Sequence, residues 1–476
     1  MNRLTITLTM LLGAGAVGQT SIPPEPVEIG TTPQLVLDSY IVDNTWAVRY
    51  KTQHVNRVFH PPRKHPGNPL LRGPVNYVCA ARDEPSGKFH LWYQTSVRGQ
   101  DEERAQYAIA YASSTDGIRW EQPNLGLHEW QGSRDNNVVV CGRRRASGPW
   151  LVQVPPADRR DYRFLLAYRD ADGIHLIASR DGVHFDPASD RRIVPLPSDT
   201  QNAIVWDPHR NEYALFGRAK TIYRATGDGI LDTGESRRIA RLENKELWAD
   251  WSPDARHILL PDELDTRERY HAFYGMPTTV YAGIFFGFLW PFRWNDRIHT
   301  ELAWSRDGIQ FERHPLRPRL IDYGPAGSWD DEMVLASQWV EVGDEWWIYY
   351  AGWDGPHQSP ERHGGIGLAT LRKEGFVSLR GPAGGGVVCT RVLRWPGGKL
   401  WVNADAARGR LTVRVSTPHR AVVPGFDHAD CLPFQGDRVA AEIRWKQRSI
   451  AELKGQEIRL EFFLQDADLY SFRAGP

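Results

Sequence analysis

The chain has no excess of either charge sign and has little cysteine. Its 476 residues carry 58 Lys and Arg against 58 Asp and Glu, so the formal net charge is zero. Proteins that bind nucleic acid usually carry a clear basic excess, so this balance argues against such a partner. Four cysteines in a chain of this length exclude a disulfide-stapled scaffold. A Cys389–Cys431 bridge and four isolated buried thiols (with Cys79 and Cys141) are both compatible with the sequence.

Long apolar runs are also scarce, and one stands at the N-terminus. Arg3 precedes an apolar stretch over residues 4–17 that ends in small residues, which predicts a signal peptide over residues 1–18. A retained N-terminal anchor is the alternative, although the run is short for a full membrane span. No later segment is long and apolar enough to cross a bilayer. We therefore expect a secreted or periplasmic mature chain without a membrane span.

Aromatic residues and turn formers are abundant instead. The chain contains 19 Trp, 17 Tyr and 17 Phe, together with 43 Gly and 33 Pro. Aromatic side chains favour strands, and Gly and Pro favour tight turns. The hydrophobic fraction of 41% and the charged fraction of 24% are those of a globular protein rather than a disordered one. The composition therefore predicts an all-β fold.

An internal repeat divides the chain into units. Residues 113–120 read SSTDGIRW, residues 178–185 read ASRDGVHF, and residues 304–311 read WSRDGIQF. Asp-Gly between alternating runs is a strong hairpin signal, so the repeated Asp116, Asp181 and Asp307 are predicted to form turns rather than to catalyse. The 126-residue gap before the third copy is about twice the first gap of 65. Degenerate copies at 244–248 and 373–376 complete five units.

Each unit also carries an alternating strand before its turn. Units of about 60 residues with short strands are typical of β-propeller blades. We therefore predict a five-bladed β-propeller over residues 19–384. After the glycines at 384–386 the chain alternates again, which predicts a C-terminal β-sandwich over 385–476. The alternating strands in the five units are 89–94, 162–168, 212–217, 270–275 with 282–290, and 345–350.

Several stretches resemble a known family. They are residues 35–41, 65–70, 199–202, 302–308 and 327–330, with Asn403 and Gly409 in the tail. With these motifs the chain resembles the five-bladed propeller glycoside hydrolases of families 32 and 43, and it looks closest to a little-characterised group of secreted bacterial family-32-like proteins. The resemblance implies a propeller followed by a β-sandwich, and hydrolysis of glycosidic bonds in an oligo- or polysaccharide.

The chain departs from family 32 at the first inner strand. There the family has an Asn-Asp-Pro motif whose Asp is the nucleophile, whereas residues 73–77 read GPVNY and hold no carboxylate. The family's Arg-Asp-Pro and Glu-Cys motifs are also absent as such, and residues 169–171 (RDA) echo the first of them only loosely. The invertase-type mechanism therefore cannot be transferred to this chain residue by residue.

Glycosidic cleavage uses two carboxyl groups, which a propeller would present at the starts of its inner strands. Asp199 precedes the predicted inner strand of blade 3, and Asp330 precedes that of blade 5. Asp38 could replace the missing acid of blade 1, with an edge-strand charge as the alternative. A cap or salt bridge is the alternative for Asp330. Glu301 is expected on a solvated outer face.

Further side chains near these positions are candidates for substrate binding. Amide, hydroxyl, imidazole and guanidinium groups can bind sugar hydroxyls or an anionic sugar, and Trp rings can stack on sugar rings; satisfied core residues are the alternative. The candidates are Asn202, Arg218, His271, Tyr274, Trp329, Asp331, Trp353 and His357.

No cofactor or metal is expected from the sequence. His357 and His363 flank Glu361 on a loop, but this spacing is weak evidence for a metal site. A Ca²⁺ ion at the propeller axis is conceivable from related propellers, with Gln, Asn and backbone carbonyls as its ligands, although no calcium-loop motif supports it.

These features together favour a secreted carbohydrate-active hydrolase that uses paired carboxylates in the propeller funnel. A non-catalytic glycan-binding propeller is the main alternative, because the blade 1 acid is missing. A phosphorylase or lyase on the same scaffold is a third hypothesis. A phosphorylase would need a basic cluster in the funnel, for which Arg218 is the obvious candidate in the sequence.

Overall fold

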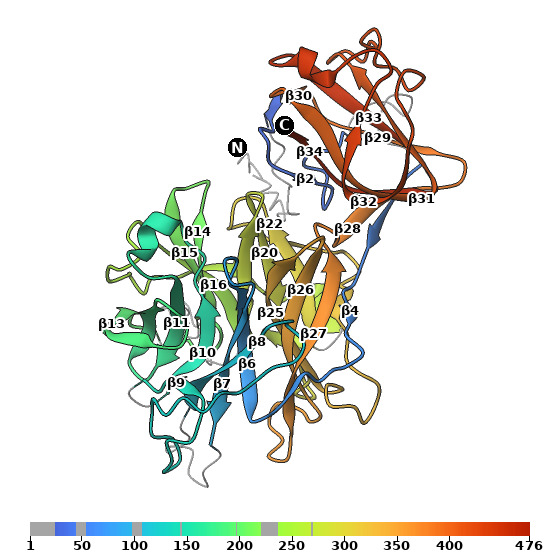
Figure 1. Ribbon diagram of the computed structural model, residues 1–476. Coiled ribbons are helices and arrows are strands. Elements are labelled where there is room, and N and C mark those ends of the chain that lie inside the picture. The colour runs from blue at the N-terminus through green and yellow to red at the C-terminus, as the bar shows by residue number, and fades with distance from the viewer. Residues whose placement is uncertain are drawn as a thin grey trace, which may run out of the picture.

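The computed structural model describes residues 24–43, 54–97, 107–142, 145–196, 198–219, 237–267 and 270–476. It consists of a large body of radially arranged sheets and a smaller C-terminal sheet (Figure 1). Within these ranges the one α-helix is α1 (Glu263–Arg267). The all-β prediction is confirmed. None of the helices in the described ranges has the length and apolar character of a membrane span.

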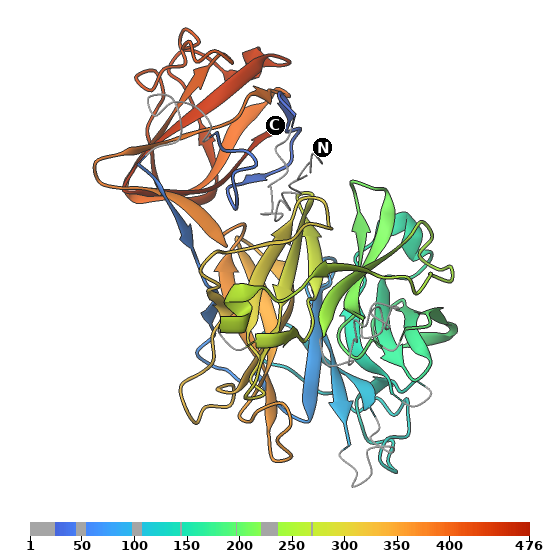
Figure 2. The ribbon, with the colours of Figure 1, turned by 180° about the vertical axis from the view of Figure 1, so that it is seen from behind.

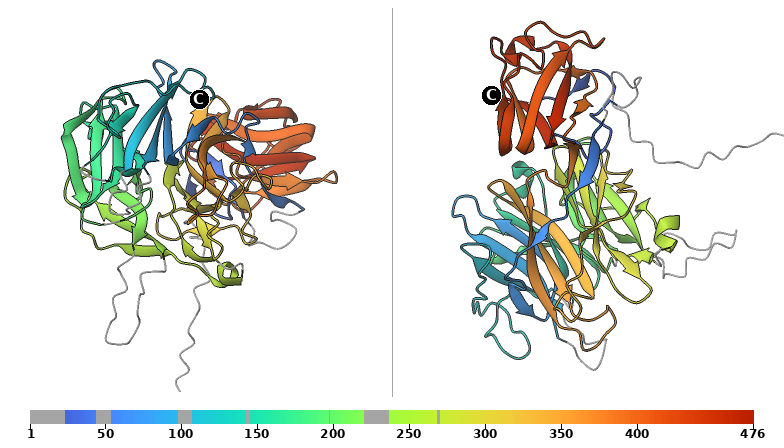
Figure 3. Two further views of the ribbon diagram at one scale, coloured as in Figure 1. Left: turned by 90° about the horizontal axis from the view of Figure 1, so that it is seen from below. Right: turned by 90° about the vertical axis from the view of Figure 1, so that its right-hand side faces the viewer.

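The large body is a five-bladed β-propeller, as predicted. Each blade is built on a four-stranded antiparallel run whose first strand lies nearest the axis, and Figure 3 (left) shows the blades from below. Blade 1 contains β6 (Val75–Arg82), β7 (Phe89–Ser96), β8 (Tyr107–Ser114) and β9 (Val138–Val140). Blade 2 contains β10 (Ser147–Leu151), β11 (Phe164–Asp170), β12 (Gly173–Ser179) and β13 (Phe185–Val194). Blade 3 contains β14 (Ala203–Asp207), β15 (Glu212–Ala219), β16 (Arg238–Asn244) and β17 (Arg256–Leu259).

Blade 4 has an interrupted inner strand. Its sheet contains β19 (Thr278–Tyr281), β20 (Ile284–Leu289), β22 (Thr300–Ser305) and β23 (Glu312–Arg313), with β24 (Arg319–Ile321) also paired to β22. The short pair β18 (Tyr270–Phe273) and β21 (Pro291–Arg293) extends this inner hairpin as a separate two-stranded sheet. Backbone hydrogen bonds between Tyr274 and Trp290 and between Trp290 and Gly275 continue the hairpin across the break.

The N-terminal part of the chain closes the ring. Blade 5 contains β25 (Met333–Val342), β26 (Glu345–Trp353) and β27 (Gly364–Arg372), and its outer edge is supplied by β4 (Arg63–Lys64) and β5 (Leu71–Gly73). These two strands pair with β27 across about 300 residues of sequence. The last blade is therefore completed by residues that precede the first blade.

The Asp-Gly repeats form the predicted turns. In each full copy a Ser hydroxyl donates to the Asp carboxylate and accepts the amide of the following Gly, as Ser114 does with Asp116 and Gly117. The three glycines have φ values of 72°, 81° and 69°, which suit residues without a Cβ. The carboxylates also accept backbone amides two and three residues further on. Asp116, Asp181 and Asp307 are thus turn formers.

The C-terminal sheet curls into the predicted β-sandwich and includes three strands from the N-terminus. It contains β28 (Val377–Gly381), β29 (Gly386–Cys389), β30 (Leu393–Arg394), β31 (Lys399–Ser416), β32 (Phe434–Ile443), β33 (Glu457–Gln465) and β34 (Ala467–Gly475). β1 (Val27–Glu28), β2 (Gln34–Leu35) and β3 (Asn56–Phe59) join it from the start of the chain. Figure 2 shows these blue strands beside the red and orange sheet. The sheet thus starts at β28, ahead of residue 385, and takes in part of the N-terminal range.

All four cysteines are free thiols. The Cys389–Cys431 bridge is therefore absent, and the alternative of four isolated thiols is the one observed. Cys79, Cys389 and Cys431 are buried, and Cys141 is half-buried. Burial raises the pKa of Cys141 and of Cys431 to about 11. A thiol with such a pKa is protonated at neutral pH and has little nucleophilic reactivity.

Candidate functional site

The antiparallel blades bring one set of strand ends to a common face. In each blade the first strand starts where the second strand ends and the third begins. We call this face, defined by Asp199, Arg169, Arg218, Arg237 and Tyr274, the mouth. The other end of the propeller faces the C-terminal sheet, where Arg372 at the end of β27 donates to Asn403 in β31 at 2.6 Å. The mouth is therefore the end of the propeller remote from that sheet.

Asp199 lies at the mouth between two arginines. It precedes β14, and its carboxylate is 3.3 Å from Arg169 Nη1 and 3.3 Å from Arg218 Nη2. Arg169 lies near the end of β11 in blade 2, and Arg218 near the end of β15 in blade 3. The Asp199 side chain is 50% exposed, so its carboxylate is open to a ligand from solvent.

Arg218 is buried beneath this carboxylate. Its side chain is fully enclosed, and its Nη1 donates to the backbone carbonyl of Tyr274 at 3.3 Å. The guanidinium carbons of Arg218 and Arg237 each lie 5.1 Å from the centre of the Tyr274 ring. Cation–π contacts of this kind hold a guanidinium in place without using its N–H donors. The Tyr274 ring therefore positions two of the arginines of the mouth.

His357 reaches the mouth from the loop after β26. Its Nε2 is 2.8 Å from the Tyr274 hydroxyl. Burial, and then the nearby Arg362, Arg237 and Arg218, lower the pKa of His357 to about 3. The imidazole is consequently neutral at physiological pH, and the positive charge of the mouth comes from the guanidinium groups.

A cavity of about 780 Å³ opens at the mouth between blades 1 and 5. Burial, and then the charge of Asp199, raise the pKa of Tyr107, which lines this cavity. An apolar cluster that includes Tyr77, Trp290 and Met333 lies under the mouth. The residues that line the cavity include Arg72, Asn76, Tyr107, Trp353, Arg362 and His363.

The propeller axis below the mouth is crossed by two glutamines. The Gln201 amide donates to the backbone carbonyls of Val78 and Pro149 at 3.0 and 2.7 Å, and the Gln338 amide donates to that of Ala80 at 3.0 Å. Gln and backbone carbonyls were the ligands expected for an axial Ca²⁺. Here those three carbonyls already accept hydrogen bonds from the glutamine amides.

Asp330 lies in a different environment from Asp199. Its carboxylate is 2.6 Å from Lys64 Nζ, accepts a hydrogen bond from the Tyr350 hydroxyl at 2.9 Å, and is only 4% exposed. The Trp329 ring stacks on Tyr350 at 5.5 Å. The Asp331 carboxylate accepts the Gly327 amide at 2.6 Å and so closes the preceding turn. The contacts of Asp330 join blade 5 to the ring-closing strand β4.

Asp38 lies at the opposite end of the propeller from the mouth. Both of its carboxylate oxygens accept hydrogen bonds from Arg306, each at 3.0 Å, and its side chain is 3% exposed. Arg306 follows the end of β22, the third strand of blade 4, and third strands start at the mouth. Asp38 therefore attaches the N-terminal segment to blade 4, far from Asp199.

The remaining candidates lie at or near the mouth. Asn202 is fully buried, and its amide donates to the backbone carbonyls of Ser198 and Thr200, which shapes the loop that carries Asp199. Trp353 ends β26 and lines the cavity. His271 lies in β18, but its side chain is outside the described part of the structure. The Glu301 expectation was wrong, because Glu301 is 2% exposed and pairs with Arg313 at 2.6 Å.

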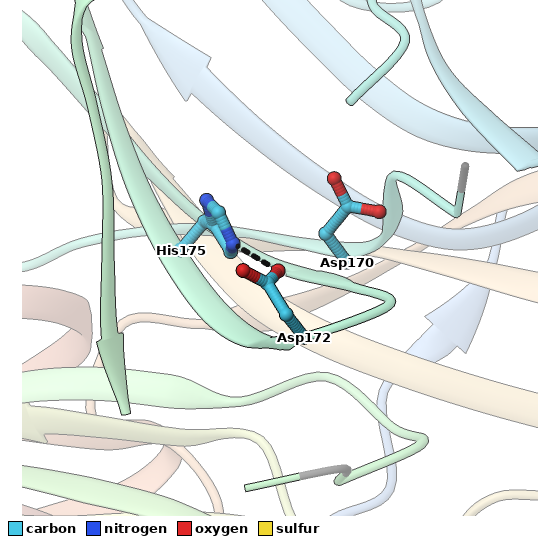
Figure 4. Close-up of side chains that lie close together, drawn as sticks. All are labelled: Asp170, Asp172 and His175. Atoms are coloured by element: carbon cyan, nitrogen blue, oxygen red, sulfur yellow. Dashed lines mark hydrogen bonds and ion pairs between the residues drawn. The ribbon is translucent and has the colours of Figure 1, made fainter. Parts of the chain in front are cut away.

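Asp170, Asp172 and His175 also lie close together, on the β11–β12 hairpin (Figure 4). His175 Nε2 is 2.8 Å from Asp172, and its Nδ1 is 3.0 Å from Asp190. Burial alone would lower the pKa of His175, but these two hydrogen bonds outweigh it and raise the pKa. A histidine that donates from both ring nitrogens has no lone pair for a metal ion. The hydrogen bonds explain this cluster without a metal.

Sequence reasoning did not select Arg169, Arg237 or the tyrosines of blade 1 for this site. One sequence signal did point to Arg169, because residues 169–171 loosely resemble the Arg-Asp-Pro motif. In the structure, Arg169 Nη1 lies 3.3 Å from the Asp199 carboxylate. Arg237 carries no motif of its own, and it reaches the mouth because it directly precedes the third strand of blade 3.

No protein-family model and no curated protein matches the chain. Several solved structures are similar to it in fold. A glycosyl hydrolase from Bacteroides ovatus is 13% identical, with 66% of this chain and 94% of that chain covered and a TM-score of 0.44. A thermostable family-43 glycoside hydrolase is 13% identical over 67% and 96% of the two chains, with a TM-score of 0.42. A β-1,2-mannobiose phosphorylase from Listeria innocua is 12% identical over 65% and 96%, with a TM-score of 0.42.

Proposed function

We propose that the protein is a secreted carbohydrate-active hydrolase that cleaves a glycosidic bond at the mouth, with Asp199 as the central carboxylate. The observation that carries this proposal is the exposure of the three candidate acids. The Asp199 side chain is 50% exposed, whereas those of Asp330 and Asp38 are 4% and 3% exposed and closed by cations. A catalytic carboxylate has to reach the substrate, and Asp199 is the candidate that does.

The surroundings of Asp199 suit an ionised carboxylate. Two guanidinium groups balance its charge, which favours a role as nucleophile or base rather than as acid. A glycosidic transition state develops positive charge on the sugar ring, and a nearby carboxylate stabilises it. The adjoining cavity of about 780 Å³ is within the size range of small-molecule sites.

The second carboxyl group is proposed to be Glu332. It directly precedes β25, the inner strand of blade 5, and its backbone amide donates to the carbonyl of Trp353, which lines the cavity. Burial raises the pKa of Glu332, Arg297 at 3.0 Å opposes this shift, and Asp331 adds to it. A carboxyl group with a raised pKa stays protonated up to a higher pH than an ordinary glutamate does, and a general acid must be protonated before it can act.

The test is reducing-sugar release by residues 19–476 across a panel of oligo- and polysaccharides. We expect Asp199→Asn and Glu332→Gln each to lower kcat about 10²- to 10⁴-fold, the usual contribution of an acid or base, with little change in Tm. Asp330→Asn is the matched control, and it should lower Tm while keeping most of the activity. Full activity in Asp199→Asn would refute the proposal.

A non-catalytic glycan-binding propeller is the second candidate, and Asn76 favours it. Asn76 is the second residue of the inner strand of blade 1, where the resembling enzymes have their nucleophile, and its side chain accepts the Tyr77 amide at 3.0 Å. If no panel glycan is cleaved but one raises the Tm of the wild type and not of Asp199→Asn, binding without catalysis is the better description.

A further inference from the structure

Three arginines from two blades meet one carboxylate at the mouth. Arg169 and Arg218 both pair with Asp199, and Arg218 and Arg237 share the Tyr274 ring. We call these three residues the arginine cluster. Among the residues that the structure describes, their three guanidinium charges meet the one carboxylate of Asp199, which leaves two positive charges in excess. A buried or half-buried excess of this kind is costly unless an anion balances it.

Several N–H donors of the arginine cluster are buried and unused. Arg218 Nε and Nη2, Arg237 Nη1 and Arg169 Nε have no hydrogen-bond partner among the residues that the structure describes. Arg218 Nη2 does make the 3.3 Å ion pair with the Asp199 carboxylate. Buried polar groups in native proteins nearly always have partners, so a cluster of unused guanidinium donors indicates a ligand.

The Arg218 side chain is fully enclosed, so it cannot turn to solvent to satisfy its donors. Guanidinium groups match carboxylate and phosphate oxygens, which accept from two N–H donors at once. Burial, and then the charges of Arg362, Arg237 and Arg218, lower the pKa of the neighbouring His357, so this imidazole adds no positive charge to the cluster.

We propose that the arginine cluster of Arg169, Arg218 and Arg237 is a binding subsite for an oxyanion. The ligand group is either the carboxylate of an acidic sugar residue in the glycan substrate or free inorganic phosphate. The first source rests on the proposed function and makes the preferred substrate an acidic glycan. Asp199 competes with the ligand for the same N–H donors, because it already pairs with two of the three arginines.

Isothermal titration calorimetry at low ionic strength tests this subsite with three ligands. They are inorganic phosphate, an oligogalacturonide, and the neutral galacto-oligosaccharide of the same length. Binding of the galacturonide at least tenfold tighter than the neutral sugar assigns the subsite to an acidic sugar. Binding of phosphate with equal affinity for the two sugars assigns it to free phosphate.

Arg169→Gln is the main variant, because its side chain is 13% exposed and its loss disturbs packing less than that of Arg218. We expect it to weaken anion binding at least tenfold and to change neutral-sugar binding less than twofold. Arg191→Gln is the matched control and should bind as the wild type does, because it removes a half-exposed arginine of blade 2 that pairs with Asp250 of blade 3. Asp199→Asn should bind the anion severalfold more tightly than the wild type, because a competing carboxylate is gone.

The inference is overturned if neither anion binds the wild type at millimolar concentration, or if Arg169→Gln and Arg191→Gln bind the anion equally. Failure here is separable from failure of the hydrolase proposal. Cleavage of neutral glycans that depends on Asp199, without anion binding, would keep the hydrolase and remove the subsite. Anion binding that depends on Arg169, without cleavage of any glycan, would do the reverse.

Discussion

At the scale of single residues, the surroundings of Glu312 change the pKa of its carboxyl group. Glu312 in β23 is half-buried near Asp38, and burial followed by the Asp38 charge raises the pKa of Glu312 to about 7, with Arg306 and Arg57 opposing. The folded protein therefore holds this proton more tightly than the unfolded chain, whose glutamate has an ordinary pKa. Stability contributed by protonated Glu312 is lost as the pH rises from about 4.5 to about 7.

We therefore expect Glu312→Gln to be more stable than the wild type at pH 8 and nearly equal to it at pH 4.5. Urea unfolding at the two pH values measures the difference. Glu246→Gln, an exposed glutamate in blade 3, is the control and should show no such dependence. A constant difference between Glu312→Gln and the wild type at both pH values would contradict the assignment.

Residues whose role is local could be predicted from the sequence, and residues whose role is a distant contact could not. Asp116 and its repeats form turns because their partners lie two and three residues away. The exposure of Glu301 was predicted wrongly because its partner lies on another strand. Arg313 of β23 pairs with Glu301 and also with Asp265 of α1. Asp330 resembled Asp199 in sequence context, but its cation, Lys64, lies 266 residues away.

At the scale of elements, the ring-closing strand β4 is the shortest strand of blade 5, and an ion pair supplements its backbone pairing with β27. Lys64 Nζ contacts Asp330 at 2.6 Å and lies over the Tyr350 ring at 5.4 Å. We expect Lys64→Met to leave the Asp330 carboxylate buried without its cation and to lower stability by about 1–3 kcal/mol, less than a fully buried pair because Lys64 is partly exposed.

Differential scanning calorimetry of Lys64→Met beside Lys88→Met, an exposed lysine in blade 1, measures this effect. The control should keep the wild-type Tm. Equal Tm values for the two variants would show that the pair does not hold β4 in place.

The blades themselves were predictable because each is a local antiparallel run with its own turn signal. The closing strands were not, since β4 and β5 have two and three residues and pair only with β27. The break in the inner strand of blade 4 was also missed, because 270–275 reads as one alternating strand. The mouth follows from the blade topology, which brings together residues that no sequence spacing relates.

At the scale of the whole molecule, the N-terminal segment and the C-terminal sheet are held together by buried charges. The Asp43 carboxylate is 2.7 Å from Arg459 Nη1 and 2.7 Å from Arg420 Nη2, and all three side chains are nearly inaccessible. We expect Asp43→Asn to cost about 3–5 kcal/mol, the range for breaking a buried pair, because two buried guanidinium groups lose the charge of Asp43.

Limited proteolysis and thermal unfolding of Asp43→Asn measure this loss. Cleavage near residue 43 should become faster than in the wild type. Asp254→Asn, an exposed aspartate in blade 3, is the control. Unchanged proteolysis and unchanged Tm in Asp43→Asn would mean that the segment is anchored by its strands alone.

The path of the chain crosses twice between the two bodies, since β1 to β3 pair within the C-terminal sheet and β4 and β5 pair within the last blade. During synthesis from the N-terminus, the first strands made are therefore among the last to find partners. β3 cannot pair until β28 has been synthesised, and β2 cannot pair until β34 has been, whose last residue is Gly475. No single cut can separate the propeller from the sheet with both intact. All strands of the propeller, β4 to β27, lie in the one continuous stretch 63–372, whereas expression of the C-terminal sheet alone requires joining β1–β3 to β28–β34 or supplying those N-terminal strands.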